Sequence, residues 1–438
     1  MNQNSTPPKA ISPINKGYTR KALLLLLCLL PFSPFLITFL GTFVGQNIII
    51  NSWKEILLFI VFMVLCLKSP KTFIHLARRS RAVQIIIAYV LFLGVVLFMG
   101  RKDLASGAGF VFAVRFLLAF MVGLMAWKLI AVADTTKKLI YIAIIICLIG
   151  FVVLLLPNQL LTHVGYDAPG MDTLNNPASI HYVSEGLNIE RMMSTFKSPN
   201  SLGLYLLLPL ALVLFAKKKS SLTRALLALF TFSVISTFSR SAFIGLLFIA
   251  VYYTVGQRSV LLVRIKKLSV RSRLAVVVSS LLLLVALVPV SSRLLFHQES
   301  GNDNGSTSVR ITQYQKDIKN IVAHPSGNGL GTASLAGRVN GKGVVVSENY
   351  YLQIGRESGI IGLVLFLGIL IYLYKDLKTL NGTTRSVLIA SFFALSIASL
   401  FIPVWADEVV AITWWLFAGL VLGKQLGASV STNTEEVL

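Results

Sequence analysis

The run LIYIAIIICLIGFVVLLL, which extends from Leu139 to Leu156, contains no charged residue. A helix needs about 17–25 mainly apolar residues to cross the hydrocarbon core of a bilayer. A strand of a membrane β-barrel would instead alternate polar and apolar residues over about ten positions. Because this run is continuously apolar, it predicts a membrane-spanning α-helix.

The composition extends this prediction to the whole chain of 438 residues. Hydrophobic residues make up 55% of the sequence and charged residues only 13%, whereas soluble domains carry about 25% charged residues. The composition therefore excludes a water-soluble enzyme, a disordered protein and a disulfide scaffold, and it predicts an all-α polytopic membrane protein. We expect about twelve transmembrane helices, near residues 22–43, 54–67, 83–99, 107–127, 139–156, 200–216, 225–238, 241–255, 274–292, 350–374, 386–403 and 409–423.

The formal net charge of +23 follows the expected topology of these spans. With the N-terminus in the cytoplasm, the inner segments hold 26 of the 40 Lys and Arg residues but only four of the 17 Asp and Glu residues. Such an excess inside fixes the orientation of a multi-pass protein. We therefore expect cytoplasmic tails at 1–21 and 424–438 around a single transmembrane catalytic domain at 22–423. No basic patch remains for nucleic acid, so the bilayer is the expected partner.

Two long connections are expected on the outer face, at residues 157–200 and 291–349. Connections of this length usually have a function. Residues 310–322 have apolar residues spaced for an amphipathic helix, and His324-Pro325 should end it, because the residue before a proline is pushed out of the helical region. The two loops also gather polar residues, among them His163 and His181, as either a membrane enzyme with an outer active site or the vestibule of a transporter would.

Four segments carry the polar residues of most interest. In the first, Arg191 precedes Asn200, which is a good candidate for the N-cap of the following span. In the second, Arg240 lies between two spans with almost no loop; an arginine at that depth is costly unless it is paired or hydrated, so it either faces a polar cavity or extends to the interface.

The other two segments flank the end of the second long loop. One runs from Arg310 to His324 and then to the glycines of Gly327–Gly331, which would let the backbone approach a ligand closely. The last holds Glu348 and, nine residues later, Glu357 beside Arg356. Acidic residues at the rim of a membrane span are functional by default, whereas Asn349 could serve as an N-cap and Gly359 and Gly362 as close helix contacts.

Together the four segments resemble the bacterial O-antigen ligase/polymerase superfamily of membrane glycosyltransferases over about residues 190–365. That family shows an arginine before Phe-x-x-Pro-Asn, then Ser-Arg-Ser between two middle spans. It continues with an arginine before His-Pro and Gly-x-Gly, and with His-Asn followed at a fixed distance by Gly-x-x-Gly. Here these positions are Arg191 with Asn200, Arg240, Arg310 with His324, and Glu348-Asn349 with Gly359 and Gly362. Glu348 stands where the ligases have histidine, which looks more like a polymerase of O-antigen or exopolysaccharide.

The resemblance implies a donor glycan on undecaprenyl diphosphate, used at the outer face of the bacterial inner membrane without a metal or cofactor. Glu348 would be the base, and Arg240 and Arg310 would bind the diphosphate, as bidentate arginines do. Further partners would be a chain-length regulator and a flippase. The remaining residues that we expect to bind substrate are Arg191, Asn200, His324, Asn349, Arg356 and Glu357.

Two alternatives stay open. An O-antigen ligase of lipopolysaccharide biosynthesis would transfer the glycan to lipid A core instead of to another repeat unit. A flippase or transporter of lipid-linked sugars would also have twelve spans, but it should show internal repeats, and none is visible in the sequence. Arg115 is the deep charge that favours the transporter.

Overall fold

The computed structural model describes residues 13–44, 48–100, 102–166, 180–183, 189–256, 306–340 and 345–435. These residues form α- and 3-10 helices with one isolated β-bridge, between Tyr182 and Glu190. The helices are α1 Pro13–Leu29, η1 Leu30–Phe32, α2 Ser33–Val44, α3 Ile48–Asn51, α4 Trp53–Lys68, α5 Pro70–Arg79, α6 Arg81–Met99, α7 Leu104–Ala126, α8 Val132–Leu155, α9 Asn158–His163, α10 Pro199–Leu214, α11 Ser221–Ser236, α12 Arg240–Gly256, α15 Ser306–Ala323, η2 Leu335–Asn340, α16 Tyr350–Lys378, α17 Gly382–Ala398, η3 Val404–Ala406 and α18 Glu408–Glu435.

The all-helical membrane fold is confirmed, but the number of twelve spans is not. Six helical segments are long and apolar enough to cross a membrane, or seven if α4 and α5, bent by 98°, count as one span. The helices at four other predicted spans, α10, α11, α12 and α17, have 16 or 17 residues. At about 1.5 Å per residue they are shorter than the ~30 Å hydrocarbon core. The predicted span at 274–292 lies outside the described residues.

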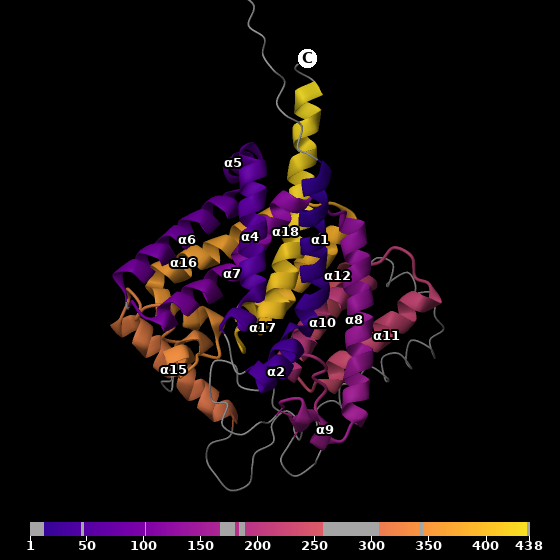
Figure 1. Ribbon diagram of the computed structural model, residues 1–438, viewed down its shortest axis with the longest axis vertical. Helices are drawn as coiled ribbons and strands as arrows, with labels where there is room; N and C mark the ends of the chain where they lie inside the picture. Colours follow the sequence, from indigo (N-terminus) through magenta and orange to yellow (C-terminus); the bar gives the residue numbers. More distant parts are fainter. Residues whose placement is uncertain are drawn as a thin grey trace, which may run out of the picture.

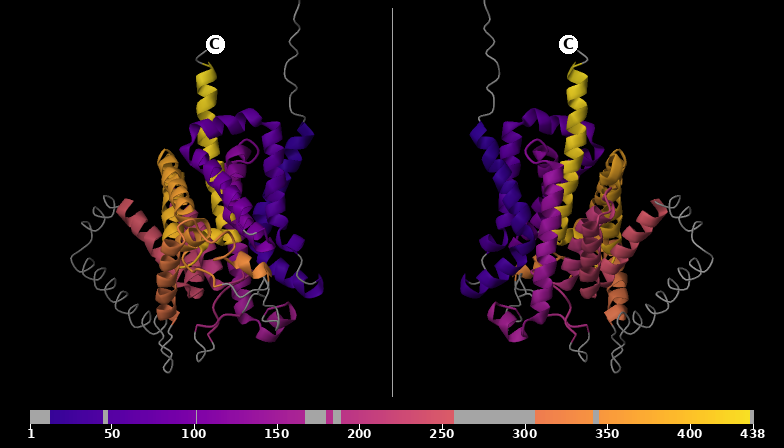
Figure 2. Two further views of the ribbon diagram at one scale, coloured as in Figure 1. Left: turned by 90° about the vertical axis from the view of Figure 1, so that its left-hand side faces the viewer. Right: turned by 90° about the vertical axis from the view of Figure 1, so that its right-hand side faces the viewer.

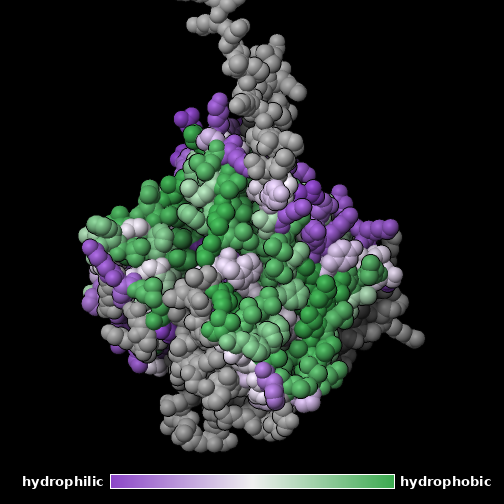
Figure 3. Space-filling view, in the orientation of Figure 1, coloured by the Kyte–Doolittle hydropathy of each residue, from purple (hydrophilic) through white to green (hydrophobic). Residues whose placement is uncertain are grey.

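Both polar ends of the molecule can be recognised. Helix α1 begins at the same end as α18 terminates, and the basic helix α5 lies there too, whereas α9 and α15 lie toward the opposite end (Figure 1; Figure 2). Between these ends, one face of the molecule is covered by hydrophobic residues (Figure 3). Large apolar side chains are exposed on the helices, among them Leu91 and Phe98 of α6 and Leu155 of α8. Such exposure suits a surface in contact with lipid.

The centre of the bundle is built on α7 and α18. A Cβ added at Gly419 would come within 2.2 Å of the backbone oxygen of Phe120, and one at Gly423 within 2.4 Å of the oxygen of Leu124. Small residues of this kind let two membrane helices pack closely. Buried aromatic rings of Trp405, Trp414 and Trp415 then fill the space around the start of α18.

The segment that follows α15 is fixed to the bundle through its backbone. Helix α16 breaks at Gly359, whose φ is 71°. Next to the break, Asn328 N–H donates to the oxygen of Arg356 (2.8 Å), and Gly329 N–H donates to the oxygen of Glu357 (3.1 Å). In return, Ile360 N–H donates to the oxygen of Pro325 (2.9 Å).

The glycines of this loop serve the same contact. A Cβ at Gly327 would lie 2.5 Å from the nitrogen of Gly359, and one at Gly331 would lie 2.5 Å from the oxygen of Ala105 on α7. Gly327 and Gly331 thus let the loop approach the backbones of α16 and α7, whereas a Cβ at Gly329 would meet nothing within 4 Å, so close approach of this loop to a ligand stays a prediction. As expected, α15 covers residues 310–322 and ends immediately before His324.

Replacing Gly359 with alanine should therefore destabilise the protein. A left-handed residue with a side chain costs roughly 1–2 kcal/mol, and the new Cβ would lie 2.3 Å from the oxygen of Pro325. We expect a lower thermal midpoint for the purified protein in detergent. The matched control is Gly368→Ala in the same helix, where a Cβ meets only side-chain atoms of Ile85 at 3.6 Å. Equal midpoints for the two variants would contradict this account.

Candidate functional site

Arg191 and Asn200, predicted from the first segment, are in direct contact. The Nη2 of Arg191 donates to the Oδ1 of Asn200 at 2.9 Å, and its Nε donates to the backbone oxygen of Thr237 at 2.9 Å. The prediction that Asn200 is an N-cap is wrong. Ser198 caps α10, because its hydroxyl accepts from the backbone N–H of Ser201, and this leaves the amide of Asn200 free for the arginine.

The second predicted arginine lies beside the first. Arg240 begins α12 and is half-buried, after a turn in which Phe238 has a φ of 48°. Burial, and then the positive charge of Arg240, lowers the pKa of Arg191 to about 10, so Arg191 stays charged at neutral pH. The charge of Arg310 in turn acts on Arg240. The fold thus brings together three arginines that are far apart in sequence.

Glu348 completes this group. The Nε of Arg310 on α15 forms an ion pair with the Oε2 of Glu348, just before α16. The two side chains are 38% and 43% exposed, so a substrate can reach both. Burial, and then the negative charge of Glu348, raises the pKa of the nearby Tyr314 hydroxyl. Three arginines against one carboxylate leave an excess of positive charge, which favours binding of an anion such as a phosphate.

Asp317 holds this pair in place and was missed from the sequence. Its carboxylate is 1% exposed and accepts from the hydroxyl of Ser347 (2.6 Å), from Arg356 (2.9 Å) and from Gln313 (2.7 Å). It therefore links α15, which carries Arg310, to the residue that precedes Glu348. A single aspartate in an amphipathic helix gives no signal of this role, because its partners lie 30 and 39 residues away.

The remaining predicted residues have contacts within the protein. Asn349 is the N-cap of α16 and accepts from the N–H groups of Tyr351 and Leu352, as expected. Glu357 is buried and accepts from the N–H of Ala333 at 3.0 Å. His324 is exposed after the end of α15. These contacts give Asn349, Arg356 and Glu357 structural roles, and substrate binding by them and by His324 stays a prediction.

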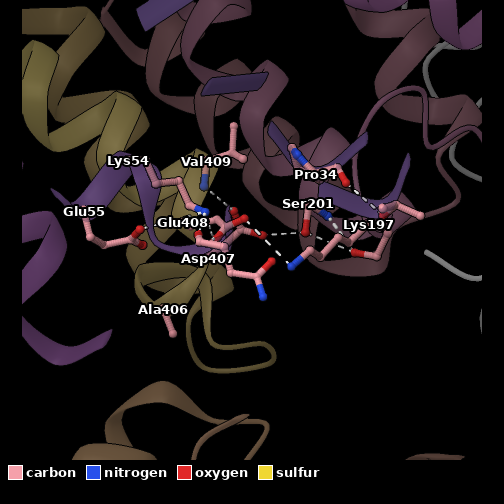
Figure 4. A network of polar contacts seen from close by, with 12 residues as sticks. Pro34, Lys54, Glu55, Lys197, Ser201, Ala406, Asp407, Glu408 and Val409 are labelled. Atoms are coloured by element: carbon pink, nitrogen blue, oxygen red, sulfur yellow. Dashed lines mark hydrogen bonds and ion pairs between the residues drawn. The ribbon is translucent and has the colours of Figure 1, made fainter. Parts of the chain in front are cut away.

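A second charged cluster lies on α4, α7 and the start of α18 (Figure 4). Lys54 is fully buried and contacts Glu408 at 2.9 Å. Arg115 contacts Glu55 at 3.0 Å and Glu408 at 3.5 Å, and it also donates to the backbone oxygen of Ala406. Arg115, the deep charge that we considered as a transporter feature, is thus a member of an ion-pair network.

The two clusters meet at the first turn of α10. Asn200 contacts Arg191, and the next residue, Ser201, donates its hydroxyl to Asp407 beside the second cluster. Asp407 is also the N-cap of α18, since its Oδ1 accepts from the N–H groups of Val409 and Val410 at 3.0 Å. A cavity of about 640 Å³ lies against this second cluster.

The fold and site thus define an all-helical, multi-pass membrane protein with an arginine- and glutamate-containing site next to its membrane bundle. A family model described as O-antigen ligase matches residues 225–367. The matched region contains Arg240, Arg310, Glu348 and their structural partner Asp317, and it supports the resemblance to the O-antigen ligase/polymerase superfamily. A search of curated proteins gave no match to the chain.

Removing one member of the buried ion network should destabilise the protein strongly. Lys54→Met leaves Glu408 without its closest cation, and breaking a buried ion pair costs about 3–5 kcal/mol. We expect a large fall in the thermal midpoint, with partial recovery in the double variant Lys54→Met/Glu408→Gln, which leaves Arg115 and Glu55 paired. The exposed Lys319→Met is the matched control. A Lys54→Met variant as stable as this control would show that the network contributes little.

Proposed function

We propose that the protein is a membrane glycosyltransferase that polymerises repeat units of O-antigen or exopolysaccharide. The observation that carries this proposal is the Arg310–Glu348 contact beside Arg240 and Arg191. A partly exposed carboxylate next to an excess of arginines is what transfer from a lipid diphosphate needs: a base for the acceptor hydroxyl and cations for the leaving group.

In the proposed reaction the donor glycan is attached to undecaprenyl diphosphate and is used at the outer face of the inner membrane. Both termini are cytoplasmic, and residues 22–423 form one catalytic domain. An acceptor hydroxyl attacks the anomeric carbon while its proton passes to Glu348. The bond from that carbon to the diphosphate oxygen breaks, and the diphosphate leaves with the electron pair, stabilised by Arg240 and Arg310.

The ion pair suggests how the two roles are coupled. With no donor bound, Arg310 neutralises Glu348. A donor diphosphate carries more negative charge than one carboxylate and can draw the guanidinium toward itself, because arginine binds phosphate oxygens through two parallel hydrogen bonds. Glu348 then becomes a free acceptor for a proton. Asp317 acts as a positioning residue that keeps α15 and the Glu348 segment in register.

A second candidate is the O-antigen ligase, the activity that the description of the matching family model names. Its chemistry at the donor is the same, and only the acceptor differs: lipid A core instead of a second lipid-linked repeat unit. Glu348 at the position of the ligase histidine favours the polymerase. A chain-length regulator and a flippase are the protein partners that a polymerase implies.

Glu348→Gln should abolish glycan transfer, because an amide cannot accept the proton of the acceptor hydroxyl. Glu348→His keeps a base at this position and should retain part of the activity. The measurement is transfer by purified protein in detergent, with thermal midpoints to show that each variant is folded. Because Glu348 is 43% exposed, neither change should unfold the protein. Full activity of Glu348→Gln would exclude Glu348 as the base.

The product distinguishes the candidate functions. Purified protein given only lipid-linked repeat units, with a chelator present, should form a ladder of longer lipid-linked oligosaccharides. A protein that is inactive until lipid A core is added, and then glycosylates it, is a ligase. In sealed vesicles, movement of the lipid-linked sugar between leaflets without any new glycosidic bond would contradict the enzyme proposal and favour the transporter.

A further inference from the structure

The cavity of about 640 Å³ lies beside the proposed catalytic group and is separate from it. Helices α2, α4 and α7, the starts of α10 and α18, and η2 provide its walls, whereas Arg191, Arg240, Arg310 and Glu348 are not among the residues that line it. Its volume falls within the 300–1,000 Å³ of typical ligand pockets. The proposed transfer reaction needs two substrates, and the arginine group accounts for the diphosphate of one.

One wall of the cavity is apolar. Ile37 of α2 and Leu104, Val111 and Phe112 of α7 line this side. Leu104 and Val111 are exposed, although α7 otherwise packs within the bundle. Such a wall can accept hydrocarbon, but it gives no partner to a free sugar or a free inorganic ion.

The cavity is also lined by charged residues, and most of their charge is already compensated. Lys54 and Arg115 are buried against Glu55 and Glu408, with contacts of 2.9–3.5 Å. Asp407 accepts from Ser201 and from two backbone N–H groups. These residues hold the helices together, and three of their buried atoms make no hydrogen bond with the described residues: the Nε of Arg115, the Oε2 of Glu55 and the Oε1 of Glu408.

Two further cations line the cavity: Lys197, in a long ion pair, and Arg338, which has no ion pair with the residues that the structure describes. Lys197 is 34% exposed, and its nearest carboxylate is that of Glu408, at 3.9 Å. Arg338, half-buried on η2, makes no hydrogen bond or ion pair with the residues that the structure describes. In all, four Lys and Arg residues line the cavity against three Asp and Glu residues. A partly exposed lysine, an arginine without an ion pair and several apolar side chains in one cavity suit an amphipathic anion.

The position of the cavity indicates which substrate this anion belongs to. Ser198 and Ser201, which line the cavity, lie on either side of Asn200, the partner of Arg191, so the cavity and the arginine group meet at the start of α10. On its other side the cavity is lined by Val346 and Gln353, which flank Glu348 in sequence. A glycan that starts in the cavity can therefore extend toward the proposed base.

We propose that this cavity binds the second lipid-linked substrate, the acceptor, with its diphosphate at Lys197 and Arg338 and the first part of its isoprenoid chain along α2 and α7. This assignment rests on the proposed polymerase function. It predicts two sites for polyprenyl diphosphate in one chain, one at Arg240 and Arg310 for the donor and one in the cavity for the acceptor.

The test is the number of undecaprenyl diphosphate molecules bound to the purified protein, measured by native mass spectrometry during a titration. We expect two for the wild type. In Lys197→Gln/Arg338→Gln the second molecule should bind at least about tenfold more weakly, because the loss of even one charge-assisted hydrogen bond has an effect of this size. The matched control Arg224→Gln/Lys319→Gln removes two exposed cations and should still bind two. Thermal midpoints establish that the variants are folded.

Other outcomes separate the two proposals. A wild type that binds one molecule, or a cavity variant that still binds two with unchanged affinity, would overturn the acceptor site. So would displacement of the second molecule by an excess of phosphatidylglycerol, which would mark a general site for anionic lipids. If Arg240→Gln/Arg310→Gln binds two but the cavity variant binds one, the acceptor site stands and the role of the two arginines in donor binding fails.

Discussion

The backbone contact between residues 325–329 and the break of α16 is the constraint on which the site depends. Gly359 interrupts the helix, and the carbonyls of Arg356 and Glu357 accept from Asn328 and Gly329 of the loop. The loop is thereby fixed against the bundle at one end, and α15 leads directly into it. Asp317 adds a second link, to Ser347 and Arg356. These two links fix the backbone segments that carry Arg310 and Glu348, so the two side chains lie within reach of one another.

Two charged clusters meet at the N-terminal end of α10 and have different roles. The arginine group holds three cations against one carboxylate, so it keeps an affinity for anions. The second cluster pairs Lys54 and Arg115 with Glu55 and Glu408, so it mainly stabilises the packing of α4, α7 and α18. Lys197, in a long ion pair with Glu408, and Arg338 add positive charge to the cavity, which apolar side chains also line.

The sequence predicted the helices well because their signal is local. Apolar runs identify helix α8, and the spacing of apolar residues before His324 identifies α15. No local pattern joins the residues of the candidate site, so only the resemblance to a family predicted that they lie close together. These residues are Arg191, Arg240, Arg310 and Glu348. Nothing in the sequence indicated the roles of Lys54, Glu55 and Asp317, because a charge at the start of a span or on an amphipathic helix is usually solvated. Only their tertiary contacts show that these residues are buried or paired. The 98° bend after α4 and the N-cap at Ser198 were missed for the same reason.

The central claim is that Arg310 is shared between Glu348 and the donor diphosphate. The most direct measurement is an experimental structure of the protein with undecaprenyl diphosphate bound, in which the position of that guanidinium can be seen. We predict that diphosphate oxygens contact both Arg240 and Arg310, and that Arg310 has moved away from the carboxylate of Glu348. A diphosphate bound elsewhere, with the Arg310–Glu348 ion pair intact, would contradict the account.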